Sequence, residues 1–374
     1  MSVCKYREVA AVLGKEIQES KYSAGKFPSV VALMRRFRVS RATASRVVGE
    51  FKRRGVVKGV SGRGIFISRA GASRKIAILF PETGTSEYYT KIVKTITILA
   101  QKKEYVVLFA EIESTDSKMQ VSEAERMAKI ICENDVSGVI FQPVAHVAAM
   151  EAVNKRILSV FGSAKIPVVL CDCDCLLDVS ERSEFDVVGV NNIVAGAMLY
   201  RHLYEAGAGR ISYLTIADSA RSHNDRLRGA ALEHRKLVGK PWQDSSVLIA
   251  NPDDLSAVKR YVRKERPDGF ICGNDRTAAL LLRTLGQIGV SVPADMLVTG
   301  FNDVSISRLS SPSITTVRQP TDVIGQTVLR RLFERIAKPD LPTVEILVNA
   351  PLVARESTNC KTTERQPHDK QRSR

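Results

Sequence analysis

The sequence has no uninterrupted apolar run of the roughly 18 residues that would indicate a transmembrane helix. Its N-terminus also lacks a charged start followed by an apolar core, so we expect no secretory signal. The 374 residues include seven cysteines, an odd number that favours free thiols in a reducing compartment over a disulfide framework. These absences argue against a membrane-spanning or disulfide-stapled protein, and we expect a cytoplasmic location.

Catalytic motifs are absent as well. There is neither a Gly-x-x-x-x-Gly-Lys-Ser/Thr phosphate loop nor a Gly-x-Ser-x-Gly nucleophile elbow. The thiols of Cys171, Cys173 and Cys175 alternate onto one face of an extended segment, but no nearby His or Cys completes four ligands at zinc-like spacing. The histidines are scattered along the chain, and we expect each to lie on the surface or to pack in the core rather than to act in catalysis. The sequence therefore predicts no enzyme, no metal site and no cofactor.

Acidic residues are scarce in one part of the chain only. Residues 1–74 contain 17 Lys and Arg against four Glu and no Asp, a net charge of +13, and residues 359–374 carry +3. The remaining 34 basic and 34 acidic residues leave residues 75–358 neutral. So dense a basic segment predicts a polyanionic partner, because each phosphate contact releases counterions. The alternative is a basic surface that serves solubility alone.

The first 70 residues have the pattern of three helices and a hairpin. Apolar residues recur at helical spacing in 6–20, and Ser29 and Ser40 are placed to cap a second and a third helix. Two apolar runs, 56–57 and 65–67, follow with glycines between them and predict a small β-hairpin. This order of elements is that of a winged helix-turn-helix.

The start of the third helix and the turn of the hairpin hold the candidate DNA contacts. A recognition helix presents its N-terminal turns to the major groove, where Arg41 can hold a guanine with two hydrogen bonds. Gly62 leaves room for close approach of the backbone, and Arg63 suits the minor groove or a phosphate. The predicted contacts are Ser40, Arg41, Thr43, Ser45, Arg46, Gly62 and Arg63. Helix capping alone would also explain Ser40 and Thr43.

The segment FPSVVALMRRFRVSRATASRVVGEFKRRGVVKGVSGRGIFI resembles the winged-helix domain of GntR-type bacterial transcription regulators. Its Pro-Ser, Val-Ser-Arg-x-Thr and Gly-x-Gly-x-Phe elements stand in the order of that family, and the likeness spans about residues 5–68. Val30 and Val31 stand where the family has an acidic residue and an Arg, and Ser45 replaces a further Arg. The resemblance implies a DNA-binding domain at 1–68 with double-stranded operator DNA as its partner.

Strand-like apolar runs alternate with helical stretches beyond residue 75, after a small polar linker at 69–74. The runs are 75–80, 105–109, 138–141, 167–170, 187–190, 211–215, 269–272 and 297–300. This alternation predicts an α/β fold with parallel sheets that carry helices on both faces. Such sheets bind ligands at the carboxyl ends of their strands, and two of them would leave a cleft in between.

Residues 75–358 resemble the effector-binding domain of LacI/GalR-type repressors, which is related to periplasmic sugar-binding proteins. The run ICGNDRTAALLLRTLGQIGVSVPADMLVTGFNDVSISRLSSPSITTVRQP, residues 271–320, carries most of the likeness. The resemblance implies two subdomains joined by three crossovers, near 208, 313 and 341. The N-subdomain would comprise about 75–208 and 314–340, and the C-subdomain about 209–313 and 341–358. A disordered basic tail is expected at 359–374.

The candidate effector-binding residues follow the predicted strands. The carboxylate of Asp275 can accept two sugar hydroxyls, although it can equally cap the next helix. The resemblance makes Arg226 the arginine of the cleft, with Arg221 as the alternative, and sets Tyr88 and Tyr89 against a sugar ring unless they only pack under their loop. The full predicted set is Tyr88, Tyr89, Gln142, Asp172, Asn191, Arg226, Asp275 and Asn302.

We therefore expect a homodimeric transcriptional regulator on a pseudo-palindromic operator. A small ligand, expected to be a sugar, would control its affinity for DNA, with relief of repression as the expected sign. The alternative is a cytoplasmic sugar-binding protein or sugar-processing enzyme without gene regulation. The basic N-terminal segment and the missing catalytic motifs argue against that alternative.

Overall fold

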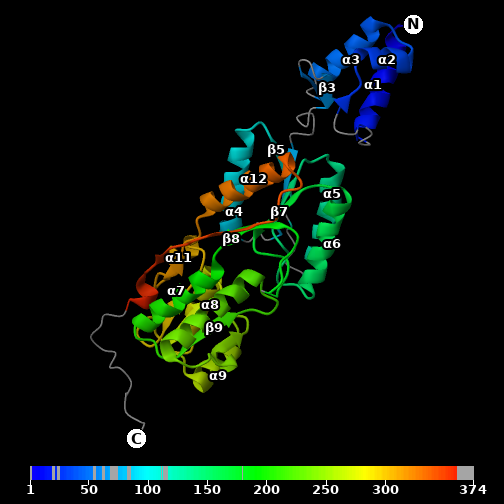
Figure 1. Cartoon of the computed structure of the whole chain (residues 1–374). Coiled ribbons are helices and arrows are strands. Elements are labelled where there is room, and N and C mark those ends of the chain that lie inside the picture. The colour runs from blue at the N-terminus through cyan, green and yellow to red at the C-terminus, as the bar shows by residue number, and fades with distance from the viewer. Residues whose placement is uncertain are drawn as a thin grey trace. The chain divides into compact units, whose positions relative to one another are not determined.

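The structure is a computed structural model that describes residues 2–18, 22, 26–53, 56–60, 64–67, 75–81, 86–110, 112, 117–178 and 180–359. The chain divides into two compact units (Figure 1). The first comprises Met1–Lys75 with Asp135–Ser137, and the second comprises Ile76–Asn134 and Gly138–Arg374. The predicted basic tail lies outside the described residues, except for Asn359.

The first unit packs three helices against a small antiparallel sheet. The helices are α1 (Ser2–Gln18), α2 (Val30–Phe37) and α3 (Arg41–Arg53). The sheet has the order β1 (Lys26–Phe27), β3 (Gly64–Ile67), β2 (Val57–Val60). Leu13, Leu33 and Val47 are fully buried in the core that the helices share. The helices and the hairpin lie where the sequence pattern predicts them, whereas β1 was not expected.

Capping residues set the limits of the short helices in this unit. The Ser29 hydroxyl accepts a hydrogen bond from the Ala32 amide at 3.2 Å, so it caps the start of α2. Arg38, with φ 48°, ends that helix in the left-handed conformation. The Ser40 hydroxyl then accepts from the Thr43 amide at 3.2 Å and starts α3. The chain therefore turns between α2 and α3 within three residues.

The first lobe of the second unit is built on a six-stranded sheet. Its order is β14 (Glu345–Val348), β8 (Asp186–Val190), β7 (Val168–Asp172), β6 (Val139–Phe141), β4 (Lys75–Leu79), β5 (Val106–Ala110). The strands from β14 to β4 pair in parallel. Its helices are α4 (Glu87–Gln101), α5 (Ser117–Glu133), α6 (Met150–Ser163) and α12 (Thr321–Ala337) (Figure 1).

The second lobe is built on a parallel sheet of four strands. Its order is β10 (Val247–Ile249), β9 (Ile211–Thr215), β11 (Gly269–Cys272), β12 (Leu297–Thr299). Its helices are α7 (Asn192–Glu205), α8 (Arg221–Val238), α9 (Leu255–Glu265), α10 (Asp275–Gln287) and α11 (Ser305–Leu309). A two-stranded antiparallel ribbon, β13 (Thr316–Val317) with β15 (Leu352–Val353), accompanies the crossovers.

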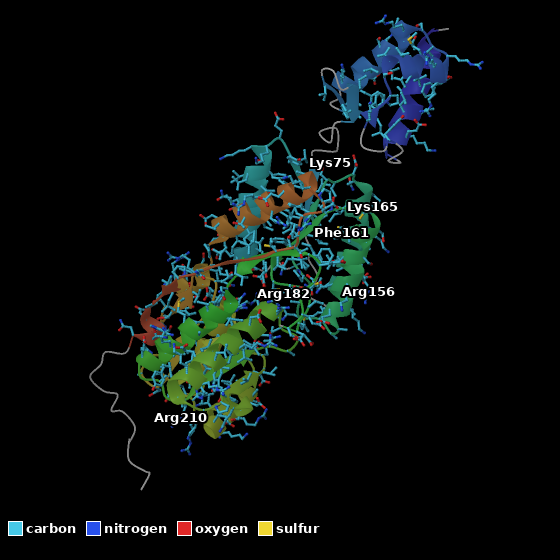
Figure 2. The ribbon with its side chains drawn as sticks, in the orientation of Figure 1. Lys75, Arg156, Phe161, Lys165, Arg182 and Arg210 are labelled. Carbon is cyan, nitrogen blue, oxygen red and sulfur yellow. The ribbon has the colours of Figure 1, made fainter. Side chains whose placement is uncertain are left out.

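Burial explains why these runs form central strands. β7, β8 and β9 are buried at every residue, as expected for parallel strands covered on both faces. Helix α6 has one side in the core and one side in solvent. On α6, Phe161 is fully buried, whereas Arg156 is exposed and pairs with Glu125 at 2.8 Å (Figure 2).

Two of the expected subdomain limits are wrong. Helix α7, predicted in the first subdomain, packs so closely on α8 that a Cβ at Gly196 would overlap the carbonyl oxygen of Arg226. The chain therefore crosses directly after β8 and not near residue 208. Strand β14, predicted in the second subdomain, pairs with β8 in the first sheet, so the last crossover follows Val348 and not residue 341. Strand pairing and helix packing over long sequence separations determine both positions.

Candidate ligand-binding cleft

A cavity of about 420 Å³ lies between the two lobes of the second unit. Its walls come from the end of β7 and from the segments that follow β4, β5, β6, β9, β11 and β12, at the carboxyl ends of the two sheets, together with Gln319. The polar residues of the lining are Ser86, Glu87, Tyr88, Tyr89, Gln120, His146, Asp172, Ser222, His223, Arg226, Asn274, Arg276, Asn302 and Gln319. Five of the eight predicted effector contacts are therefore brought together here, namely Tyr88, Tyr89, Asp172, Arg226 and Asn302.

Asp172 is a buried carboxylate in this lining. It is the last residue of β7, is 7% exposed and has a left-handed φ of 83°. The Tyr88 hydroxyl donates to its Oδ1 at 3.2 Å, and the Ser222 side chain from the other lobe also hydrogen-bonds it. Burial raises the pKa of Asp172, and the positive charge of Arg226 opposes that rise. Asp172 is thus an acceptor that both lobes share.

Arg226 lies opposite Asp172 and is 4% exposed. Its Nε donates to the Ser222 carbonyl at 3.0 Å, and one terminal nitrogen donates to the Gly273 carbonyl. The guanidinium carbon lies 4.0 Å from the centroid of the Phe301 ring. The protein itself therefore fixes the orientation of this cation in the cleft. Arg221, the alternative, donates to the Leu176 and Asp178 carbonyls and does not line the cavity.

Asp275 is not part of the lining, although the sequence made it the principal acceptor for the ligand. Its side chain is fully buried. Oδ1 accepts from the Thr316 hydroxyl at 2.6 Å, and Oδ2 accepts from the Val304 amide at 2.9 Å. Its own neighbours Asn274 and Arg276 face the cavity instead, and Asn274 is the residue that caps α10. Asp275 therefore anchors the crossover segments to the second lobe.

Two other predicted residues are also outside the lining. Gln142 is 2% exposed behind the end of β6, where its backbone N–H donates to the Leu79 carbonyl at 3.0 Å. Asn191 caps α7 by accepting from the Val194 amide at 3.2 Å. Asn302, by contrast, reaches the cavity from a left-handed φ of 114° and accepts from Gln319 Nε2 at 2.7 Å.

A histidine pair crosses the cleft and was missed in the sequence. His146 follows β6 of the first lobe, and His223 lies in α8 of the second, with ring centroids 6.0 Å apart. Burial lowers the pKa of both, and the charge of Arg226 lowers that of His223 further. The only signal for His146 was its place shortly after a predicted strand. Nothing local marked His223, because the second lobe brings it to the site.

The first unit presents a cationic face on α3. Arg41, Ser45 and Arg46 are exposed, whereas Val47 and Val48 on the other side are buried in the core. The Arg46 guanidinium carbon lies 4.7 Å from the Tyr6 ring centroid. Ser40 and Thr43 bond each other at the helix start, so capping is at least part of their role. Gly62 and Arg63 lie outside the described residues.

Neither a metal-ligating cluster nor a membrane helix is found within the described ranges. No group of three or more His, Cys, Asp and Glu side chains there is placed to hold a metal ion. Burial raises the pKa of the Cys171 and Cys173 thiols well above the ordinary value. Among the residues that the structure describes, no helix is both long and apolar enough to cross a bilayer.

Known proteins share this architecture. Residues 200–358 match the family described as periplasmic binding protein-like domain. The chain is 27% identical over 345 residues to the arabinose metabolism transcriptional repressor of Geobacillus stearothermophilus, over 89% of this chain and 91% of that protein.

Solved structures with the same fold include two regulators. The transcriptional regulator CelR in complex with cellobiose has a TM-score of 0.65 and 21% identity, over 85% of this chain and 91% of CelR. CcpA of Lactococcus lactis has a TM-score of 0.65 and 18% identity, over 77% of this chain and all of CcpA. The chain is therefore a ligand-controlled, DNA-binding transcriptional repressor with a periplasmic-binding-protein-like effector domain, and not an enzyme.

Proposed function

We propose that residues 1–68 form a GntR-type winged helix that reads operator DNA through α3 and the β2–β3 hairpin. The observation that carries this proposal is the exposure of Arg41, Ser45 and Arg46 on the first turns of α3, opposite the buried face. Three helices with an antiparallel hairpin, and the net charge of +13 over residues 1–74, support it. A homodimer would place two such helices on the half-sites of a pseudo-palindromic operator.

We propose further that a sugar binds in the cleft and relieves repression. Asp172 and Asn302 supply oxygen acceptors for hydroxyl groups, and Arg276 supplies an exposed cation at the rim. Tyr88 and Tyr89, with ring centroids 4.8 Å apart, give the first lobe an aromatic wall. The similarity to an arabinose repressor supports a monosaccharide. Because the lining comes from both lobes, such a ligand would favour one arrangement of the lobes and thereby change DNA affinity.

Binding to DNA is tested with the full chain and an operator enriched from random duplexes. The Arg41→Ala variant should lose at least about tenfold more affinity for the enriched operator than for a random duplex. The matched control is Arg263→Ala, which removes an exposed arginine from α9. Equal losses on both duplexes would reduce Arg41 to a phosphate contact and refute base reading by this residue.

Ligand binding is tested by the melting temperature of the protein against a panel of pentoses, hexoses and disaccharides. A sugar that binds only the folded state raises the melting temperature by mass action. The Asp172→Asn variant should lose that shift and the release from operator, while its binding to DNA without sugar stays unchanged. A shift that persists in Asp172→Asn would place the ligand elsewhere, and no shift with any sugar would refute a sugar effector.

A further inference from the structure

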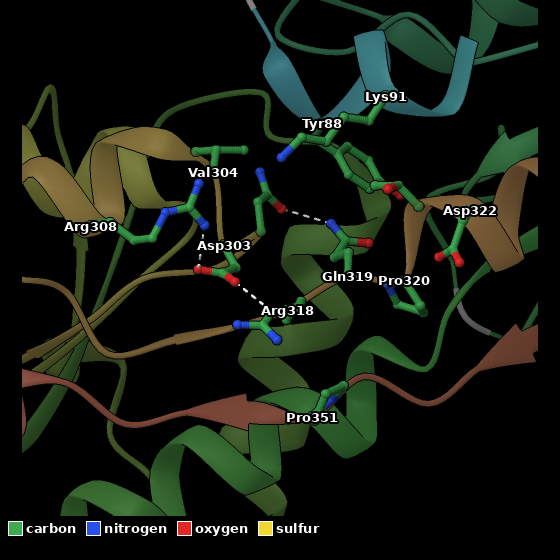
Figure 3. Close-up of a pocket in the computed structure, with 12 residues that line it drawn as sticks. Tyr88, Lys91, Asp303, Val304, Arg308, Arg318, Gln319, Pro320, Asp322 and Pro351 are labelled. Carbon is green, nitrogen blue, oxygen red and sulfur yellow. Dashed lines mark hydrogen bonds and ion pairs between the residues drawn. The ribbon is translucent and has the colours of Figure 1, made fainter. Parts of the chain in front are cut away.

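A second cavity, of about 340 Å³, lies beside the ligand-binding cleft where the crossover segments meet (Figure 3). It is formed by α4, the loop after β12, α11 and the segment that leads into α12. Tyr88, Asn302, Val304 and Gln319 line both cavities. The two cavities are therefore neighbours with a common wall. We call the second cavity the hinge cavity.

Positive charge exceeds negative charge around the hinge cavity. The buried carboxylate of Asp303 accepts a hydrogen bond from Arg318 Nε at 2.6 Å, and Arg308 lies at 3.8 Å (Figure 3). Arg355 Nη2, behind the lining, donates to the same carboxylate at 2.5 Å. Burial raises the pKa of Asp303, but the hydrogen bonds from Arg318 and Arg355 outweigh burial and hold it below its ordinary value. One ionised carboxylate thus faces three guanidinium groups.

The remaining charged groups of the region leave this excess in place. Lys91 lines the cavity and pairs with Glu87 at 2.7 Å, and Asp322 stands in the first turn of α12. The lining itself thus holds three cations, Lys91, Arg308 and Arg318, against two anions, Asp303 and Asp322. Arg308 is the least committed of these cations, because its ion pair with Asp303, at 3.8 Å, is longer than that of Arg318, at 2.6 Å. An anion that enters the cavity can pair with Arg308 without first breaking a short ion pair.

Gln319 supplies a second, independent sign of a ligand. It is 6% exposed and lies in the common wall, where its Nε2 donates to Asn302 Oδ1 at 2.7 Å. Its Oε1 is buried without a hydrogen-bond partner in the part of the chain that the structure describes. A buried acceptor left unpaired costs about 1–3 kcal/mol, so a donor at this position would be favourable. A hydroxyl group of a ligand is such a donor.

We propose that the hinge cavity is a second effector site, for a phosphorylated polyhydroxy metabolite such as a sugar phosphate. The phosphate lies against Arg308 and Arg318, and a hydroxyl donates to Gln319 Oε1. A volume of about 340 Å³ accommodates a monosaccharide phosphate.

This site would couple to the cleft through the wall that they share. The hydrogen bond between Gln319 and Asn302 joins the two linings, and Lys91 of the first lobe faces Arg308 of the second across the hinge cavity. A bound anion would therefore favour one arrangement of the lobes. The metabolite would change the affinity of the cleft for its own ligand, and the reverse effect would be equal in size.

The experiment is isothermal titration of the full chain with a hexose 6-phosphate, a pentose 5-phosphate, inorganic phosphate and the unphosphorylated sugars. The wild type and the cleft variant Asp172→Asn should bind the sugar phosphates equally well. Arg308→Gln should weaken that binding at least about tenfold, because it removes one charge-assisted contact. The control Arg263→Gln should leave it unchanged. Gln319→Leu should remove the preference for sugar phosphate over inorganic phosphate.

Three results would overturn the proposal. The first is the absence of binding by any phosphorylated probe at millimolar concentration. The second is binding that Asp172→Asn abolishes and Arg308→Gln leaves intact, which would place the anion in the cleft. The third is inorganic phosphate binding as tightly as the sugar phosphates, with no effect of Gln319→Leu, which would leave a simple phosphate site. Arg308 is half-exposed, so its variant should fold, and equal melting temperatures without ligand verify this.

Discussion

The buried carboxyl of Asp275 should make the stability of the second lobe depend on pH. Burial raises its pKa to about 7, from an ordinary value of 3.8, and the nearby carboxylate of Asp303 adds to the rise. The hydrogen bonds from Thr316 and Val304 and the charge of Arg355 only partly oppose it. Between these two pH values the folded state holds a proton that the unfolded state has released. The contribution of Asp275 to the unfolding free energy is therefore fully present below about pH 4 and is lost as the pH rises to about 7.

The size of the effect follows from the two pKa values. The interval from 3.8 to about 7 corresponds to about 4 kcal/mol of unfolding free energy, of which about 2–3 kcal/mol falls between pH 5 and pH 8. Asparagine at position 275 cannot ionise. Its amide can donate to Thr316 Oγ1 while its oxygen still accepts from the Val304 amide, so Asp275→Asn preserves both hydrogen bonds. The variant should gain about 2–3 kcal/mol relative to wild type over that pH range.

Urea unfolding at pH 5, 6, 7 and 8 measures this difference. Trp242, the only tryptophan of the sequence, reports on the same lobe, because its Nε1 donates to the Ile211 carbonyl in β9 at 3.2 Å. Histidines that titrate in this range affect both proteins alike and cancel in the comparison. The exposed Asp253→Asn, also in the second lobe, is the control and should follow the wild type. Parallel curves for wild type and Asp275→Asn would refute the reasoning, because they would mean that Asp275 is already ionised at pH 5.

Two further predictions concern α7 and α8. A Cβ at Gly196 would overlap the carbonyl oxygen of Arg226, so Gly196→Ala should lower the unfolding free energy by about 3 kcal/mol. The control Gly162→Ala, where α6 has open space, should raise it by up to about 1 kcal/mol. Similar urea midpoints for the two variants would contradict this packing. Burial holds the pKa of His223 well below 6.5. The contribution of His223 to the unfolding free energy is therefore present above pH 6.5 and falls as the pH drops below that value. His223→Gln should therefore lose about 1.4 kcal/mol less than wild type per pH unit below 6.5, and identical acid profiles would show that His223 is protonated in the fold.

The sequence predicted the strands that are buried along most of their length, and also the partly exposed β5. β7, β8 and β9 are mostly apolar and buried at every residue, because helices cover both faces of their sheets. Two of the missed strands, β14 and β10, lack this signal. In β14 exposed and partly buried residues alternate from Glu345 to Val348, and β10 is an edge strand with Ile249 exposed. Sequence periodicity alone does not separate such segments from loops.

The site was predicted to the extent that it depends on strand ends. Asp172 is the last residue of β7 and Asn302 follows β12, and both reach the cleft. Asp275 follows β11 in the same way, but its side chain turns to Thr316, a partner 41 residues away. The direction of a side chain at a strand end depends on such distant partners. The pairing of His146 with His223 across the two lobes is likewise invisible until the chain is folded.

The place of β14 in the first sheet has a consequence for folding during synthesis. Strands β4 to β8 of that sheet are made by residue 190, but β14, which covers the edge of β8, begins only at Glu345. At roughly 5–20 residues per second, the ribosome needs about 8–30 s to make the chain between them. During that time the strands of the second sheet are complete, whereas β8 has an open edge that can pair with other chains. We therefore expect the second lobe to fold first, and we expect a chain truncated before residue 345 to aggregate through β8.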